Sequence, residues 1–274
     1  MRRSKSPQLS PSEFRRTLAR VLPALAGVDA ITLGGLDRVK VQHKADGSEV
    51  TSADHAGERW LRRQLRRAWP ADAIIGEEFG GALTDSGRCW TIDPIDGTAS
   101  YALGLPVYGT LLGLLIDGVP VLGFISVPGL GEVTYAATGH GCWLRKGGRR
   151  ARRVQVSQPR PLPRAQVSLT SFKASDLARP PGRWRVTALA RQAGRMRFVG
   201  DCLQYALLCR GALDAAIDPL MNPWDIAPLV PCVLEAGGCV SSLAGDTGDV
   251  VRSRSFVAAT STALRRAICR AMSG

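Results

Sequence analysis

Two apolar runs at 108–116 and 119–127 lie on either side of the dipeptide Asp117-Gly118. Asp-Gly is typical of the two-residue turns of β-hairpins, in which both central residues adopt positive φ. The sequence therefore predicts an antiparallel hairpin in the middle of the chain. The charge-free stretch 97–116 leads into it and is long enough to cross a bilayer, but it contains a proline and four glycines. We interpret this stretch as a buried loop and strand, not as a membrane helix.

Helical and strand-like patterns alternate along the rest of the chain. At 51–69, apolar positions share one face of a predicted helix, arginines occupy the other face, and Pro70 follows the end. Further helices are predicted at 202–209, 225–236 and 262–272, and strands at 88–92, 132–137, 166–169, 212–217 and 256–259. The pattern predicts a mixed α/β chain. The proline-containing stretch 158–164 would link an α+β half at 1–157, which carries most candidate metal ligands, to an α/β half at 158–274.

The net charge of +13 is unevenly distributed. The first twenty residues carry six basic side chains against Glu13, and 143–164 carries eight with no acid, so the remaining residues sum to zero. We expect the first segment to be a tail and the second to be loop-like. Clustered Lys and Arg can indicate a polyanion-binding protein, which is the non-enzymatic alternative. Neither segment interleaves aromatic residues with its arginines, so we expect solvated surfaces and no specific nucleic-acid partner.

Seven cysteines without Cys-x-x-Cys spacing are predicted to be small core residues, not zinc or redox ligands. Their odd number favours a reducing compartment, and we expect a cytoplasmic protein. The apolar run 21–36 follows a basic N-terminus but is interrupted by Pro23, Gly27 and Asp29. We therefore predict neither a signal peptide nor attachment to a membrane.

The densest candidate site is the string Asp93-Pro-Ile-Asp96-Gly97-Thr98, directly after the predicted strand at 88–92. Pro94 fixes a turn that can aim two carboxylates at one point, with the Ile95 carbonyl between them. Gly97 lets the backbone approach a ligand, and the N–H groups that follow favour phosphate. Taken alone, the string could equally be a turn with an aspartate cap.

Acids at the ends of two other apolar segments strengthen the metal interpretation. Glu77 follows an apolar pair at a strand end, and Asp225 lies at a helix start. Singly, Glu77 could be a solvated loop residue and Asp225 an N-cap. All these ligands are oxygens and the three histidines are scattered, which favours Mg²⁺ or Mn²⁺ over Zn²⁺ or Cu²⁺. Carboxylates holding two or more Mg²⁺ suit hydrolysis of a phosphate ester, and neither a Walker loop nor a Gly-x-Ser-x-Gly elbow is present.

Four ordered motifs resemble those of the inositol monophosphatase family. They are Lys44-Ala-Asp46-Gly-Ser-Glu-Val-Thr51-Ser-Ala-Asp54, Gly76-Glu77-Glu78, Asp93-Pro-Ile-Asp96-Gly97-Thr98, and Pro223-Trp224-Asp225 with Ala236-Gly-Gly238. The resemblance covers nearly the whole chain, from about Glu13 to Met272. It implies a layered αβαβα sandwich of the inositol monophosphatase and fructose-1,6-bisphosphatase type, a homodimer, and Mg²⁺-dependent hydrolysis of a small phosphomonoester.

The resemblance also implies roles for individual residues. The metal ligands, for two or three Mg²⁺ or Mn²⁺ ions, would be Glu77, Asp93, the Ile95 carbonyl, Asp96 and Asp225. Asp54 and Thr98 would orient an attacking water, with Thr51 in support. The substrate would contact Asp96, Gly97, Thr98, Gly200, Asp201, Cys202, Asp218 and Asp225, with the N–H groups of Gly97 and Thr98 on the phosphate. Water would attack in line, without a phosphoenzyme.

Within the family, the runs 104–110 and 118–128 are most similar to the histidinol-phosphatase branch. That branch implies hydrolysis of L-histidinol phosphate to L-histidinol and phosphate in histidine biosynthesis. A cationic substrate suits the acids Asp201 and Asp218, although these could equally be a helix cap and a turn residue. Asp218 also stands where a longer Glu is more usual. The alternatives are an inositol-1-monophosphatase and a phosphatase of 3′-phosphoadenosine 5′-phosphate.

Overall fold

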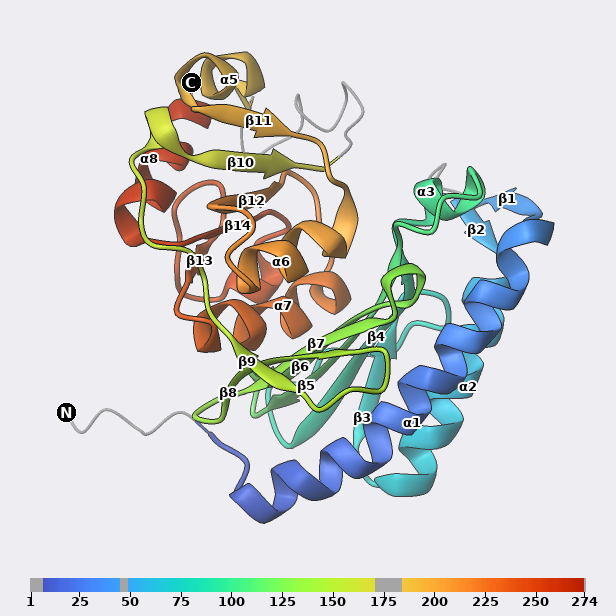
Figure 1. Cartoon of the computed structure of the whole chain (residues 1–274). Coiled ribbons are helices and arrows are strands. Elements are labelled where there is room, and N and C mark those ends of the chain that lie inside the picture. The colour runs from blue at the N-terminus through green and yellow to red at the C-terminus, as the bar shows by residue number, and fades with distance from the viewer. Residues whose placement is uncertain (1–6, 45–48, 171–183, 274) are drawn as a thin grey trace.

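Helices and sheets are stacked in five layers (Figure 1). The computed structural model describes residues 7–44, 49–170 and 184–273. A seven-stranded and a five-stranded sheet enclose two helices, and each sheet carries two helices on its outer face. From one outer layer to the other, the helices are α1 (Pro11–Gly35) with α2 (Ser52–Ala68), α6 (Asp201–Cys209) with α7 (Pro223–Glu235), and α5 (Val186–Gln192) with α8 (Thr262–Met272). This order confirms the predicted αβαβα sandwich.

The seven-stranded sheet contains the predicted hairpin. Its strands, in spatial order, are β3 (Ala73–Gly76), β4 (Arg88–Asp96), β5 (Gly109–Ile116), β6 (Val119–Val127), β7 (Glu132–Ala137), β8 (Gly141–Lys146) and β9 (Arg152–Val154). Only β3 and β4 pair in parallel among them. The turn between β5 and β6 has φ of 50° at Asp117 and 75° at Gly118, as the Asp-Gly pair predicts.

The five-stranded sheet belongs to the second half of the chain. Its strands, in spatial order, are β11 (Arg195–Arg197), β10 (Gln166–Leu169), β12 (Ala215–Asp218), β14 (Phe256–Ala259) and β13 (Cys239–Ser241). The stretch 158–164 lies between β9 and β10 and so connects the two sheets. The smaller elements are β1 (Val41–His43) paired with β2 (Glu49–Thr51), α3 (Thr98–Ala102), and the 3₁₀ turns η1 (Leu36–Arg38), η2 (Pro128–Leu130), η3 (Leu162–Arg164) and η4 (Val250–Arg252).

Helix α1 is the largest element that the sequence did not predict. It occupies residues expected to be a basic tail and an interrupted apolar run. Pro23 lowers helix propensity, but packing against α2 outweighs that cost. Gly27 is needed for this packing, because a Cβ there would lie 2.4 Å from the Trp60 ring. The Trp60 Nε1 also donates to the Ala24 carbonyl over 2.8 Å.

Residues Pro11–Arg38 are long and apolar enough for a membrane span by length and composition alone. In this structure the same helix forms part of the outer layer (Figure 1). Val21, Leu25 and Val28 are at most 1% exposed and belong to the core shared with α2 and the seven-stranded sheet. The helix is therefore a packed element of the fold.

The structure also corrects the expected nature of the two basic segments. Arg15, Arg16 and Arg20 lie on α1, and 143–164 contributes to β8, β9 and η3. From Pro11 on, the expected tail is therefore helix, whereas 143–164 combines short strands and a 3₁₀ turn with loop. Buried apolar residues between the arginines, such as Leu144 and Val154, hold the strands of 143–164 in the fold. The first six residues, with three of the basic side chains, lie outside the described residues.

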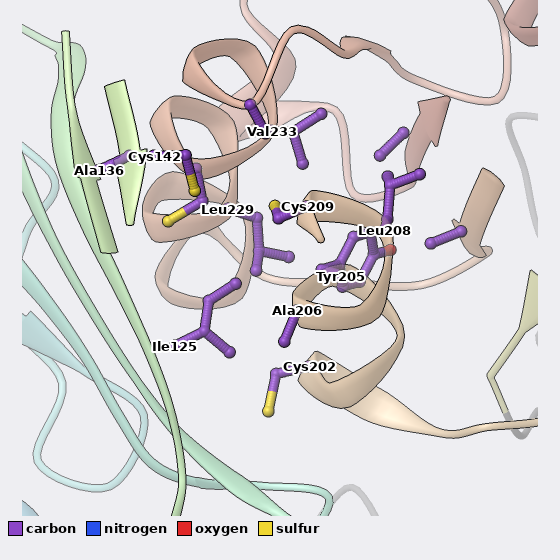
Figure 2. Close-up of a cluster of buried hydrophobic side chains, with 14 of the residues drawn as sticks. Ile125, Ala136, Cys142, Cys202, Tyr205, Ala206, Leu208, Cys209, Leu229 and Val233 are labelled. Carbon is purple, nitrogen blue, oxygen red and sulfur yellow. The ribbon is translucent and has the colours of Figure 1, made fainter. Parts of the chain in front are cut away.

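The core between the sheets joins the two halves (Figure 2). Cys142, Cys202, Cys209 and Cys232 are free thiols there and are at most 1% exposed, as predicted for small core residues. Helix α7 approaches β6 so closely that a Cβ on Gly123 would meet the backbone of α7. A helix of the second half therefore covers the inner face of the first half's sheet.

Candidate active site

The Asp93–Thr98 string forms the end of β4 and the start of α3. The strand runs on to Asp96, beyond its predicted end, and its pairing with β5 is irregular between Asp93 and Asp96. The Ile95 N–H donates to Asp93 Oδ1 over 2.9 Å, and the Thr98 hydroxyl donates to the Ile95 carbonyl over 3.0 Å. This irregular strand end holds two carboxylates and a carbonyl in one turn.

The start of α6 meets this turn from the other half of the chain. The Cys202 N–H donates to Asp96 Oδ2. Gly97 has φ of 96°, and a Cβ on it would lie 2.5 Å from Asp201 Oδ2, so only glycine suits this position. Gly200, with φ of 83°, precedes the helix. The side chain of Cys202 is buried in the core between the sheets (Figure 2), where burial and then the charges of Asp96 and Asp201 hold the pKa of its thiol well above the usual range.

Asp201 is the first residue of α6 and is held by two hydroxyls. The Thr170 and Ser100 hydroxyls each donate to its carboxylate over 3.3 Å, and its own N–H donates to Thr170 Oγ1 over 3.1 Å. Its φ of 47° is unusual for a residue other than glycine. Burial raises the pKa of Asp201. The N-cap is Gly200, so the alternative of Asp201 as a helix cap is wrong.

Thr51 and Asp54 form a capping box at the start of α2. The Thr51 hydroxyl and N–H donate to Asp54 Oδ2 over 2.6 and 2.7 Å, and the Ala53 N–H donates to Thr51 Oγ1 over 3.1 Å. The other oxygen, Asp54 Oδ1, is buried and has no hydrogen-bond partner among the described residues. Burial raises the pKa of Asp54. An unpaired buried oxygen of this kind is expected where a ligand or water belongs.

Asp225 lies in the first turn of α7 and faces Asp93. The Asn222 N–H donates to Asp225 Oδ2 over 2.7 Å, so Asn222 is the N-cap and the alternative of Asp225 as N-cap is wrong. The carboxylate of Asp225 is near enough to that of Asp93 for its charge to raise the pKa of Asp93. Burial, and then the charge of Glu77, raises the pKa of Asp225 to about 8. Burial, followed by the charges of Glu77, Asp96 and Asp225, holds the pKa of Asp93 well above its usual range.

Glu77 follows β3 and forms an ion pair with Lys44. The Lys44 Nζ lies 2.8 Å from Glu77 Oε1 and 2.9 Å from Glu78 Oε1. Burial acts to lower the pKa of Lys44, but the two carboxylates outweigh it and the pKa is raised. Glu77 is thus held in place by Lys44 and is not a freely solvated loop residue. Asp46, from the same motif as Lys44, lies outside the described residues.

Asp218 ends β12 and completes the acidic group. It lies within a strand, so the alternative of a turn residue is wrong. The Gln204 Nε2 donates to Asp218 Oδ2 over 3.1 Å. Burial, followed by the charges of Asp96, Asp201 and Asp225, holds the pKa of Asp218 well above its usual range. These mutual charge effects show that acids from both halves of the chain share one region.

The donors in this region fit a hard divalent cation. They are carboxylate and carbonyl oxygens, and burial together with mutual repulsion raises the pKa values of Asp93, Asp96, Asp218 and Asp225. In the ranges that the structure describes, no three acid, histidine or cysteine side chains are already gathered as a metal centre. A cavity of about 660 Å³ lies elsewhere, beside η3 and α8, and contains none of these acids. The acids, and not cavity size, therefore locate the candidate site.

Comparison with known proteins places this chain in a family. Residues 23–273 match the model of the inositol monophosphatase family. The chain belongs to the inositol monophosphatase family. Members of this family are metal-dependent, and its histidinol-phosphatases and inositol monophosphatases are phosphoric monoester hydrolases, the enzyme class to which this chain also belongs.

Both of the predicted branches are represented among the relatives. The chain is 42% identical to a histidinol-phosphatase of Mycobacterium tuberculosis, covering 80% of this chain and 83% of that protein. It is 35% identical to a probable inositol 1-monophosphatase of the same organism, covering 82% and 85%. A solved IMPase of Thermotoga maritima superposes with a TM-score of 0.80 at 25% identity, covering 93% and 96%. The family fold therefore extends over nearly the whole chain.

Several site residues of this family member had no role assigned from sequence. They are Lys44, Glu78, Ser100, Thr170 and Gln204. Lys44 and Glu78 lie in the quoted motifs, so the motifs themselves offered a signal. Thr170 and Gln204 have no local signal, because their partners Asp201 and Asp218 lie 31 and 14 residues away.

Proposed function

We propose that the protein is a Mg²⁺-dependent histidinol-phosphatase that hydrolyses L-histidinol phosphate to L-histidinol and phosphate. The observation that carries this proposal is Asp201, a partly buried carboxylate beside Gly97 and Asp96. Among the residues that the structure describes, the partners of this carboxylate are the Ser100 and Thr170 hydroxyls and not a cation, so it suits a positively charged leaving group. A neutral polyol would leave that charge uncompensated. The histidinol-phosphatase among the relatives, at 42% identity, supports the same substrate.

The residues that would hold two or three ions are Glu77, Asp93, the Ile95 carbonyl, Asp96 and Asp225. When bound, Mg²⁺ neutralises phosphoryl oxygens and acidifies the attacking water. One oxygen of Asp93, Asp96 and Asp225 is already fixed by a backbone N–H. That fixation orients these carboxylates before any ligand arrives and lowers the entropy lost on binding.

Asp54 and Thr98 would orient the attacking water. Because Thr51 occupies Asp54 Oδ2, the unpartnered Oδ1 is left to accept a hydrogen bond from water. The Thr98 hydroxyl donates to the Ile95 carbonyl, so its lone pairs are left to accept the second hydrogen of the same water. The backbone N–H groups of Gly97 and Thr98 would hold the phosphate that this water attacks.

Asp201 and Asp218 would bind the leaving group. Burial raises the pKa values of both acids, and repulsion from neighbouring acids adds to this at Asp218. An ammonium or imidazolium group near them would stabilise their charged forms. The Gln204 amide keeps Asp218 in place. Recognition of the leaving group thus rests on the second half of the chain, while most ligands of the metal lie in the first half.

A substrate panel tests the proposal. We expect kcat/KM with Mg²⁺ to be highest for L-histidinol phosphate, compared with inositol 1-phosphate and 3′-phosphoadenosine 5′-phosphate. Asp201→Asn should lower kcat/KM for histidinol phosphate more than for inositol 1-phosphate. A preference for either other substrate would overturn the assignment. If wild type releases no more phosphate from any of these substrates than Asp93→Asn does, the proposed phosphatase activity itself is wrong.

The expected homodimer and the choice of metal are parts of the same proposal. Light scattering should give about twice the chain mass of 29.3 kDa. Metal-free protein should regain activity with Mg²⁺ or Mn²⁺ and not with Zn²⁺, because the proposed ligands are all oxygens. A monomer in solution would contradict the proposed homodimer but would leave the proposed phosphatase reaction unaffected.

A further inference from the structure

Glu58 is a buried acid of α2 that neither the motifs nor the proposed mechanism uses. Its side chain is fully buried. Its carboxylate accepts the Glu78 N–H over 2.7 Å and the Phe79 N–H over 3.3 Å. Arg62, one helical turn further along, donates to the same carboxylate over 2.6 Å. Within the described part of the chain, the partners of this acid thus belong either to α2 or to the turn after β3.

That turn carries Glu77, the proposed metal ligand. The Gly76 N–H donates to the Gly80 carbonyl over 2.9 Å and closes the turn. Arg62 donates to the same Gly80 carbonyl from the helix side. Glu58 lies so close to the turn that a Cβ on Gly76 would be 2.1 Å from its Oε1. The Glu58–Arg62 pair therefore satisfies backbone groups on both sides of the turn.

Asp54 and Glu58 are four residues apart, so they lie on one face of α2, and both are fully buried. Asp54 is the proposed water-orienting acid, and Glu58 accepts hydrogen bonds from the turn that carries Glu77. Burying a carboxylate is costly unless it is paired and hydrogen-bonded, as Glu58 is. One helix face thus sets two parts of the site at once.

We propose that Glu58, paired with Arg62, is a positioning residue that sets the place of Glu77 relative to Asp54 and thereby tunes metal affinity. This inference rests on the proposed function, because it takes Glu77 as a metal ligand. Glu58 touches neither metal nor substrate in this scheme. It acts through the backbone of the turn.

The test is Mn²⁺ binding to the metal-free protein, followed by electron paramagnetic resonance, together with activity against Mg²⁺ concentration. Glu58→Gln keeps an oxygen for one turn N–H but loses the ion pair with Arg62. We expect its Mn²⁺ dissociation constant to rise about tenfold, the scale seen when residues behind metal ligands are changed. KM for substrate at saturating metal should stay unchanged. Arg62→Lys should give a smaller rise in the Mn²⁺ dissociation constant, because lysine keeps the positive charge beside Glu58 but loses the separate donor to the Gly80 carbonyl.

A matched control comes from Glu132, another buried acid with two cationic partners. Lys146 lies 2.7 Å from its carboxylate, and Arg210 also contacts it. Glu132→Gln removes the same charge without touching the turn. We expect both Glu→Gln variants to lose stability and only Glu58→Gln to lose metal affinity.

Equal Mn²⁺ affinity in Glu58→Gln and Glu132→Gln would overturn the inference. If Glu58→Gln does not fold, Arg62→Gln keeps the Glu58 bonds to the turn and frees Gly80, and normal metal affinity in that variant would overturn it as well. Glu77→Gln separates the two ideas. Normal metal affinity in Glu77→Gln would contradict the proposed function. Weakened affinity in Glu77→Gln together with unchanged affinity in Glu58→Gln would contradict only the inference.

Discussion

The Cys202 N–H donates a hydrogen bond to the Asp96 carboxylate across a sequence separation of 106 residues. Cys202 lies at the start of α6, and Asp96 ends β4, so the bond joins elements of the two halves. It sets the proposed leaving-group side of the candidate site directly against the proposed metal side. Neither half of the chain contains both sides.

Replacing Asp225 with Asn should separate catalysis from folding. The Asn side-chain oxygen can still accept the Asn222 N–H, so the cap of α7 is kept. We expect kcat/KM to fall by more than about 100-fold, since loss of even an outer partner of a ligand costs about 10- to 100-fold. The melting temperature of metal-free protein should not fall, because one of several mutually repelling buried acids is gone. Near-normal activity would remove Asp225 from the ligand set.

Thr51 should matter to both helix stability and turnover. Thr51→Val keeps the shape but removes the hydroxyl that binds Asp54 and accepts from the Ala53 N–H. Loss of such a cap costs about 1 kcal/mol. We expect kcat to fall as well, because Asp54 loses its orienting donor. Thr51→Ser keeps the hydroxyl and should retain most of both; if it is as impaired as Thr51→Val, the hydroxyl is not the cause.

Asp29 should make the stability of the fold depend on pH. Burial raises its pKa to about 6, although both carboxylate oxygens accept hydrogen bonds from the Ser126 hydroxyl. The native state holds the proton more tightly than the unfolded state, so this contribution to stability is complete below about pH 4 and is lost as the pH rises through about 6.

Asp29→Asn mimics the protonated acid at every pH. We expect it to be more stable than wild type above pH 6 by about 1 to 3 kcal/mol, since one pKa unit corresponds to about 1.4 kcal/mol. The two proteins should have similar stability near pH 4. Urea unfolding at both pH values measures the difference, and an equal gap at pH 4 and pH 8 would show that the charge of Asp29 is not its source.

Leu25 tests whether α1 is integral to the fold. It is fully buried between α1 and its neighbours, so Leu25→Ala should cost about 2 to 5 kcal/mol. Leu33, on the same helix, is 41% exposed, and Leu33→Ala should cost at most about 0.5 kcal/mol. Chemical denaturation compares the two. Equal costs would mean that α1 does not pack as described.

The arginines Arg149, Arg150, Arg152 and Arg153 are candidates for attracting anionic substrates. Neutralising all four should lower kcat/KM at low ionic strength by about two- to tenfold and leave kcat unchanged. The difference should vanish at high salt, where such long-range attraction is screened. An unchanged kcat/KM at low salt would show that this basic surface plays no part in substrate capture.

The central hairpin and the Asp93–Thr98 string could be predicted because each depends on residues close together in sequence, whereas the αβαβα class was implied by the resemblance to the family. Asp117-Gly118 dictates its own turn, and apolar runs of strand or helix period dictate most of β5 to β7 and α6 to α8. The helix at 51–69 was predicted for the same reason. Helix α1 could not be, because its Pro23 argues locally against a helix that only packing on α2 stabilises.

Sequence alone thus determined the family and the candidate site residues: acids at the ends of apolar segments, in motifs that identify the family. Tertiary structure alone decided how they are held. Thr170 donates a hydrogen bond to Asp201, and Gln204 donates one to Asp218. Glu58 accepts one from the turn that follows Glu77. The physical reason is that a motif depends on local covalent order, whereas a buried carboxylate takes its partners from whichever segments the fold packs around it.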